Sequence, residues 1–180
     1  MTTATDATAR LAALEPTCAL DEALALFDSL PAVRAEDITG RWHGRELGTG
    51  HPMDGLLEAS GWYGKQFDSV DEVHPLVFRA PSGKLVTVDP RRIPFGLLPR
   101  IPEGVVARGR QVMGLSLPAL TTRKHRARLR NVEYRGVVTA GMSYDHLPII
   151  DLFRRVDDRT LLGCMDLRDA PPYFFVLEKD

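Results

Sequence analysis

Apolar residues near the start of the chain recur with the period of a helix. Between residues 19 and 30 the side chains that share one helical face are Leu20, Leu24, Phe27 and Leu30. Two acids at the start suit a helix N-terminus, and Pro31 ends the pattern. This pattern predicts an amphipathic helix over Ala19–Leu30. Residues 1–17 begin with a Thr- and Ala-rich stretch and are predicted to form a mobile tail.

The rest of the chain is dominated by short segments typical of strands. A first strand is predicted over Ile38–Leu47, and a short helix is expected from Pro52 to about Tyr63. Leu76–Arg79 and Leu85–Val88 flank a Pro-Ser-Gly turn and predict a hairpin. Later strands are predicted at Arg126–Thr139, Ala140–Tyr144, Pro148–Val156, Thr160–Leu167 and Tyr173–Leu177. The proline-rich residues 89–104 are predicted to be irregular, and 105–120 remain ambiguous.

Closely spaced strands of this kind favour a sandwich or barrel over βαβ units. We therefore predict a mainly β (α+β) fold, an antiparallel lipocalin-like barrel with an N-terminal amphipathic helix and a short helix inserted after the first strand. Residues 18–180 are predicted to form one barrel domain, in which 38–90 and 126–178 are two blocks of the same barrel.

Composition narrows the function classes. The 180 residues favour one domain, and 44% apolar with 26% charged residues argue against global disorder. A formal net charge of −1 argues against a nucleic-acid partner. The chain shows no apolar run that could span a bilayer and no signal peptide within Met1–Arg10. A cytoplasmic protein with Cys18 and Cys164 reduced is therefore expected.

The segment Gly40-Arg-Trp-His-Gly44 resembles the motif that names the bacterial GXWXG family. The resemblance continues through Glu46–Leu57 and Gly61–Lys65. The later stretches that resemble the C-terminal conserved domain of unknown function in that family are Leu129–Gly136, Pro148–Asp158 and Tyr173–Leu177. The family resemblance implies no established activity, so it assigns no catalytic residue.

A Gly-x-Trp on the first strand, after a short helix, also resembles the start of lipocalin and fatty-acid-binding barrels, and of haem-binding nitrobindin-like barrels. In the former group the Trp plugs the closed end. This resemblance implies a structural role for Gly40, Trp42 and Gly44. The helix predicted after His51-Pro52 departs from those barrels.

Asp151 is the most informative charge, because on a strand it shares a face with Ile149 and Phe153. A carboxylate on an apolar face is costly unless it is paired or hydrogen-bonded. One interpretation is a buried ion pair with an arginine such as Arg154 or Arg135. The other is a pocket carboxylate with a raised pKa that can pass protons.

Two histidines precede prolines. Asp54 either caps the helix after the His51-Pro52 turn or forms a proton-transfer pair with His51 at the barrel mouth. The second His-Pro pair is at His74, but two such dipeptides do not make a metal site, and we predict none. The basic run 123–130 is interpreted as a charged strand edge rather than an RNA-binding patch.

Alternation in the segment 126–144 predicts an inward face, if no bulge intervenes. The residues on that face are Tyr134, Val138, Met142 and Tyr144. Its tyrosines either complete the core or line a pocket.

The leading functional hypothesis is a barrel cavity that binds a small apolar or amphiphilic molecule, such as a lipid, terpenoid or aromatic compound. The predicted ligand-binding residues are Tyr134, Val138, Met142, Phe153, Phe175, Trp62 and His74. The alternative is a cofactor-independent acid/base enzyme in the same pocket, such as a double-bond isomerase or hydratase. Its candidate catalytic residues are Asp151, Asp54, His51 and Tyr144.

Haem binding through His51 or His74 is a third hypothesis. Under the first two hypotheses no cofactor is required. The sequence leaves a homodimer open.

Overall fold

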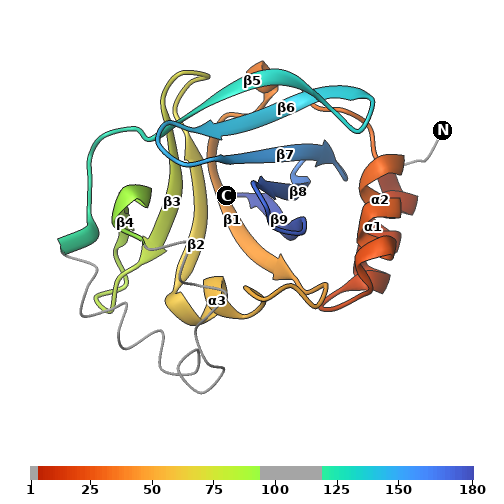
Figure 1. Cartoon of the computed structure of the whole chain (residues 1–180), viewed down its shortest axis with the longest axis horizontal. Helices are drawn as coiled ribbons and strands as arrows, with labels where there is room; N and C mark the ends of the chain where they lie inside the picture. The colour runs from red at the N-terminus through yellow and green to blue at the C-terminus, as the bar shows by residue number, and fades with distance from the viewer. Residues whose placement is uncertain (1–3, 94–118) are drawn as a thin grey trace.

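The computed structural model describes residues 4–93 and 119–180 (Figure 1). Two α-helices come first, α1 (Ala4–Leu14) and α2 (Leu20–Ser29), and α2 confirms the predicted amphipathic helix. The prediction of a mobile tail is wrong for Ala4–Leu14, which forms a helix. An Ala-rich segment favours a helix, and Ala7 and Leu11, one turn apart, are both buried in the cluster that includes α2.

The strands of the described chain form one antiparallel sheet. Its strands are β1 (Gly40–Leu47), β2 (Trp62–Phe67), β3 (Val73–Arg79), β4 (Leu85–Thr87), β5 (Ala127–Tyr134), β6 (Val137–Tyr144), β7 (Ile149–Arg155), β8 (Thr160–Leu167) and β9 (Tyr173–Lys179). Short helical turns lie at Ala35–Asp37 and Pro90–Arg92, and the short helix α3 spans Leu56–Ser60.

The sheet closes into a barrel. Its strand order is β2-β1-β9-β8-β7-β6-β5-β3-β4, and β2 also pairs with β3, so eight strands form the closed wall and β4 extends from β3. The mainly β fold, the closed antiparallel barrel, the N-terminal helix and the helix after the first strand are thus confirmed. In Figure 1, α1 and α2 lie side by side against one side of the barrel.

The pairing between β3 and β5 is short. In the described part of the chain these strands are paired at one position, where Val73 lies opposite Ala127. The backbone amide of Arg126 adds a hydrogen bond to the Val73 carbonyl, at 2.9 Å. By contrast, β5 and β6 pair along their whole length. Among the described strand pairs of the closed wall, β3 and β5 therefore share the shortest pairing.

Two predicted elements differ from those observed. Gly61 has a φ of +81° and ends α3, so the inserted helix is shorter than predicted and Trp62 begins a strand instead. The predicted strand over Arg126–Thr139 is interrupted by a two-residue turn. Arg135 and Gly136 both have positive φ, which is typical of a tight hairpin. The segment 94–118, which holds most of the irregular and ambiguous stretches, lies outside the described residues.

Two apolar clusters lie on either side of the barrel wall. The inner cluster fills the barrel and includes Trp42, Phe67 and Phe153. The outer cluster, which includes Phe27 and Cys164, packs α1 and α2 against the outside of the sheet. Both cysteines carry free thiols. Over the described ranges, no helix is long and apolar enough to cross a membrane.

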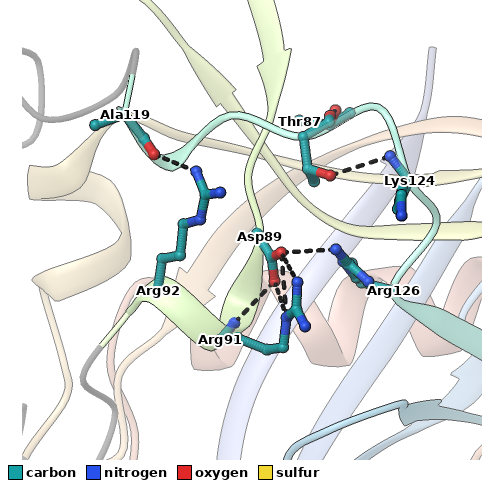
Figure 2. Close-up of polar contacts among 8 residues, drawn as sticks. Thr87, Asp89, Arg91, Arg92, Ala119, Lys124 and Arg126 are labelled. Atoms are coloured by element: carbon teal, nitrogen blue, oxygen red, sulfur yellow. Dashed lines mark hydrogen bonds and ion pairs between the residues drawn. The ribbon is translucent and has the colours of Figure 1, made fainter.

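The buried carboxylate of Asp89 connects the described residues before 94 with those after 118. Asp89 is 1% exposed and accepts hydrogen bonds from the side chain and amide of Arg91. Arg126, next to β5, contributes an ion pair of 2.8 Å to the same carboxylate (Figure 2). The hydrogen bonds from Arg91, together with the charge of Arg126, lower the pKa of Asp89 to about 2.

Candidate functional site

A narrow pocket enters the barrel interior beside α3. The free volume inside it is about 20 Å³, which is room for about one water molecule. Its lining residues come from the α3 segment and from six strands. They are Met53, Leu57, Trp62, Lys65, Leu76, Tyr144, Asp151, Met165, Tyr173 and Phe175.

A buried ion pair crosses this pocket. The Nζ atom of Lys65 lies 2.7 Å from Oδ2 of Asp151, and the two side chains are 3% and 2% exposed. The same ammonium donates to the carbonyl oxygen of Pro75 at 3.3 Å. It also lies 4.9–5.8 Å from the ring centroids of three aromatic residues, a separation suited to cation–π attraction. These are Trp62, Tyr144 and Phe175.

The partner of Asp151 corrects the arginine expected from the sequence. Arg154 has the opposite strand parity, and its guanidinium lies over the ring of Phe27 in the outer cluster. Arg135 pairs with Asp28 at 2.7 Å. Sequence reasoning missed Lys65 because its segment was not recognised as a strand. The register shifts of β2 on both sides of Gly64 also bring Lys65 to the same pocket as Trp62, which simple alternation does not predict.

Two polar atoms of pocket residues are buried without a partner. Asp151 uses Oδ2 for Lys65 and for the more distant hydroxyl of Tyr144, at 3.5 Å, while its Oδ1 has no hydrogen bond within the described chain. The indole Nε1 of Trp62 is likewise buried and unpaired there. Burial raises the pKa of Asp151, and the nearby ammonium opposes that shift. The pocket therefore contains one unused acceptor and one unused donor.

A second acid lies behind the pocket wall. Tyr173 donates its hydroxyl hydrogen to Oε1 of Glu46, and the amide of Leu57 donates to the same oxygen at 3.1 Å. Burial raises the pKa of Glu46, although both hydrogen bonds favour its charged form. Glu46 thereby ties the start of α3 to β9.

The carboxylate of Asp54, considered from the sequence as a helix cap or as the proton-transfer partner of His51, has backbone amides as its hydrogen-bond partners. Asp54 Oδ2 accepts from the amides of Thr49 and His51, at 3.0 and 2.9 Å, and so closes the turn. It does not cap α3, whose N-cap residue is Gly55. The His51 Nδ1 accepts from the amide of Met53 at 3.0 Å, and burial lowers the pKa of the ring.

Two predicted catalytic residues, Tyr144 and Asp151, line the pocket. Of the predicted ligand-binding residues, Trp62 and Phe175 line it as well, whereas Met142 and Phe153 belong to the inner core.

Three predicted ligand residues lie elsewhere. Tyr134 is on β5, and the hairpin turn puts it on the outer face, edge-on to Phe27. Val138 lies on β6, close to the turn of the same hairpin, and is 58% exposed. His74 does not line the pocket, and its ring lies beside that of His125. Of the two histidines proposed for haem, neither is among the pocket-lining residues.

Gly44 of the GXWXG-like segment makes room for a neighbouring aromatic ring. A Cβ atom on Gly44 would lie 2.2 Å from the ring of Trp62, so the ring occupies the space that a side chain would fill. Gly163 seats the ring of Phe175 in the same way, at 2.3 Å. The two rings meet edge to face at 6.0 Å. Trp42 itself is 3% exposed and is not a pocket residue, which agrees with the structural role expected for it.

Comparison with known proteins agrees with the motif. The GXWXG protein family model matches residues 25–83, and the model of a domain of unknown function, DUF4334, matches residues 125–179. A crystal structure of a protein from Thermomonospora curvata is similar, with a TM-score of 0.72 and 31% identity over 97% of this chain and 99% of that one. No curated protein matches the chain. The chain therefore belongs to the GXWXG family, with a DUF4334 domain as its C-terminal block.

Proposed function

We propose that the pocket binds a small, largely apolar molecule that carries a hydroxyl or a comparable polar group. The observation that carries this proposal is the pair of unused polar atoms on pocket residues, Asp151 Oδ1 and Trp62 Nε1. A buried polar atom without a partner costs about 1–3 kcal/mol. A ligand that donates to Asp151 and accepts from Trp62 would remove both costs at once.

The pocket walls restrict the ligand further. Apart from the polar groups already described, they consist of thioether, aliphatic and aromatic side chains. Because the free volume is only about 20 Å³, a ligand enters only when lining side chains move apart, and a compact phenol or terpenoid alcohol requires a smaller movement than a long-chain lipid. The rings of Trp62 and Phe175 offer a surface against which a flat or cyclic apolar body can pack.

A ligand panel with matched variants tests the proposal. Phenols, monoterpenoid alcohols and the corresponding hydrocarbons are titrated by calorimetry and by thermal shift, and native mass spectrometry checks for a co-purifying compound. Alcohols should bind more tightly than the hydrocarbons. Trp62→Phe keeps a ring but removes the donor, and should weaken alcohol binding by roughly 2- to 10-fold, the worth of one hydrogen bond.

Val138→Ala changes an exposed side chain outside the pocket and should leave binding unchanged. The proposal fails if no member of the panel binds. It also fails if alcohols and hydrocarbons bind equally, or if Trp62→Phe binds every compound as the unaltered protein does.

A second candidate is proton-transfer catalysis in the same pocket. It is favoured by burial, which raises the pKa of Asp151 and of Glu46 toward the range useful for acid–base chemistry at neutral pH. Glu46 reaches the pocket through the hydroxyl of Tyr173. An isomerase or hydratase would incorporate deuterium into a bound unsaturated ligand in D₂O, and Asp151→Asn should slow this by about 10²-fold or more. If the ligand is recovered without deuterium, the pocket binds it but does not catalyse proton transfer.

A further inference from the structure

Three metal-ligating side chains meet on the barrel, outside the set that lines the pocket. Asp68 follows β2, His74 lies on β3, and His125 precedes β5. Each offers one ligand atom, and these atoms all lie within 4.8 Å of one another. Asp68 Oδ2 is 3.1 Å from Nε2 of His125 and 3.9 Å from Nε2 of His74. The side chains of Asp68, His125 and His74 are 38%, 32% and 11% exposed, so solvent reaches the cluster.

The spacing suits a first-row divalent metal. In a tetrahedral zinc site with bonds of 2.0–2.1 Å, neighbouring ligand atoms lie about 3.3 Å apart. The two distances from Asp68 bracket that value, and the imidazole rings lie 4.3 Å apart between centroids. Side-chain shifts on the order of 1 Å would complete the geometry. Two imidazoles and one carboxylate also form a donor set that Zn²⁺ accepts readily.

The carboxylate is already oriented for this task. Gln66 donates from Nε2 to Oδ1 of Asp68 at 2.8 Å, which leaves Oδ2 facing the two histidines. A hydrogen bond from a neighbouring residue to the second oxygen is the usual way in which a ligating carboxylate is held. Gln66 lies opposite His74 in the β2–β3 pairing, so the same pair of strands positions both.

We propose that Asp68, His74 and His125 bind a divalent transition-metal ion, Zn²⁺ first among them, with water as the fourth ligand. Its position explains what such an ion would do. His74 and His125 come from opposite sides of the β3–β5 seam, which is paired at one described position. A bound ion links the two sides directly. It therefore acts as a clamp that stabilises the closed barrel.

Metal titration tests the clamp. The protein, freed of any polyhistidine tag and stripped with a chelator, is titrated with ZnCl₂ by calorimetry and with Co²⁺ by visible absorption. We expect one ion per chain, a tetrahedral Co²⁺ spectrum and a higher melting temperature with Zn²⁺. His125→Ala should weaken Zn²⁺ binding by about 100-fold and abolish the thermal gain. Gln66→Ala should weaken it by roughly 10-fold.

Matched variants separate the site from other metal-binding groups. His43→Ala removes an exposed histidine of β1 that lies outside the cluster, and should bind as the unaltered protein does. Equal melting temperatures in chelator show that a variant still folds. Asp68→Asn replaces His125→Ala if the latter does not fold. The proposal is overturned if Zn²⁺ does not bind, or if binding survives His125→Ala or Asp68→Asn at full affinity.

Discussion

The ammonium of Lys65 on β2 and the carboxylate of Asp151 on β7 form an ion pair inside the barrel, with 2.7 Å between Nζ and Oδ2. Neither side chain is more than 3% exposed. Replacing such a pair by apolar groups is often neutral or stabilising, whereas removing one partner leaves an uncompensated charge. Its presence among the pocket residues is therefore not explained by stability alone.

Removal of one partner should be costly. Lys65→Met leaves the carboxylate of Asp151 buried without its cation and should lower the free energy of unfolding by roughly 3–5 kcal/mol. The double variant Lys65→Met, Asp151→Asn should recover much of that loss, because both charges are gone. Urea unfolding of the four proteins measures the cycle. A loss below about 1 kcal/mol for Lys65→Met would show that the pair is solvated in solution.

Gly44→Ala should disturb the pocket from the first strand. Its new Cβ would fall 2.2 Å from the Trp62 ring, so the ring must move, at a cost of about 1–3 kcal/mol for overpacking. Tryptophan fluorescence and thermal unfolding report the shift. In a Trp62→Phe background the same change should cost less, because the smaller ring can yield. Equal costs in both backgrounds would show that Gly44 does not seat the indole.

Asp89 should make the free energy of unfolding depend on pH in the acidic range. Its folded pKa, about 2, lies below the usual value of 3.8, so its contribution is complete above about pH 4. It is lost as the pH falls toward 2, because protonation breaks the bonds to Arg91 and Arg126. Asp89→Asn should remove roughly 1–2 kcal/mol at pH 7 and flatten stability between pH 4 and 2. An unchanged acid profile would contradict this assignment.

Replacing Arg154 with an apolar residue should increase the free energy of unfolding. Arg154 is 1% exposed, and its Nε and Nη2 atoms are buried without a hydrogen bond in the described chain. Its guanidinium lies 5.1 Å from the centroid of the Phe27 ring under α2. Arg154→Met keeps much of the packing and removes the desolvated charge, so chemical denaturation should show stabilisation of about 1–3 kcal/mol. A destabilised variant would mean that the guanidinium has an essential partner in solution.

Local patterns predicted the elements that rest on local forces. The helix α2 and the strand β8 were placed closely because periodicity and turn residues mark them. The helix α1 was missed although its alanines favour a helix, because the burial of Ala7 and Leu11 that holds it depends on other elements. The hairpin turn at Arg135-Gly136 was missed because the apolar alternation continues across it.

The candidate site was predicted only in part, for a physical reason. Asp151 stood out because a charge among apolar neighbours is visible in the sequence itself. Its partner Lys65 lies 86 positions away and meets it only when the barrel closes. Asp68, His74 and His125 likewise come together through the pairing of β2, β3 and β5, so no short motif announces them.

The indole signals of ¹⁵N-labelled protein test the central claim most directly. The chain has two tryptophans: the Nε1 of Trp42 donates to the carbonyl of Thr39 at 3.1 Å, whereas the Nε1 of Trp62 has no described partner. Titration with the tightest alcohol of the panel should move the Trp62 indole signal downfield and saturably while Trp42 stays in place. A Trp62 signal that does not move at saturation, or equal shifts of both signals, would contradict ligand binding in this pocket.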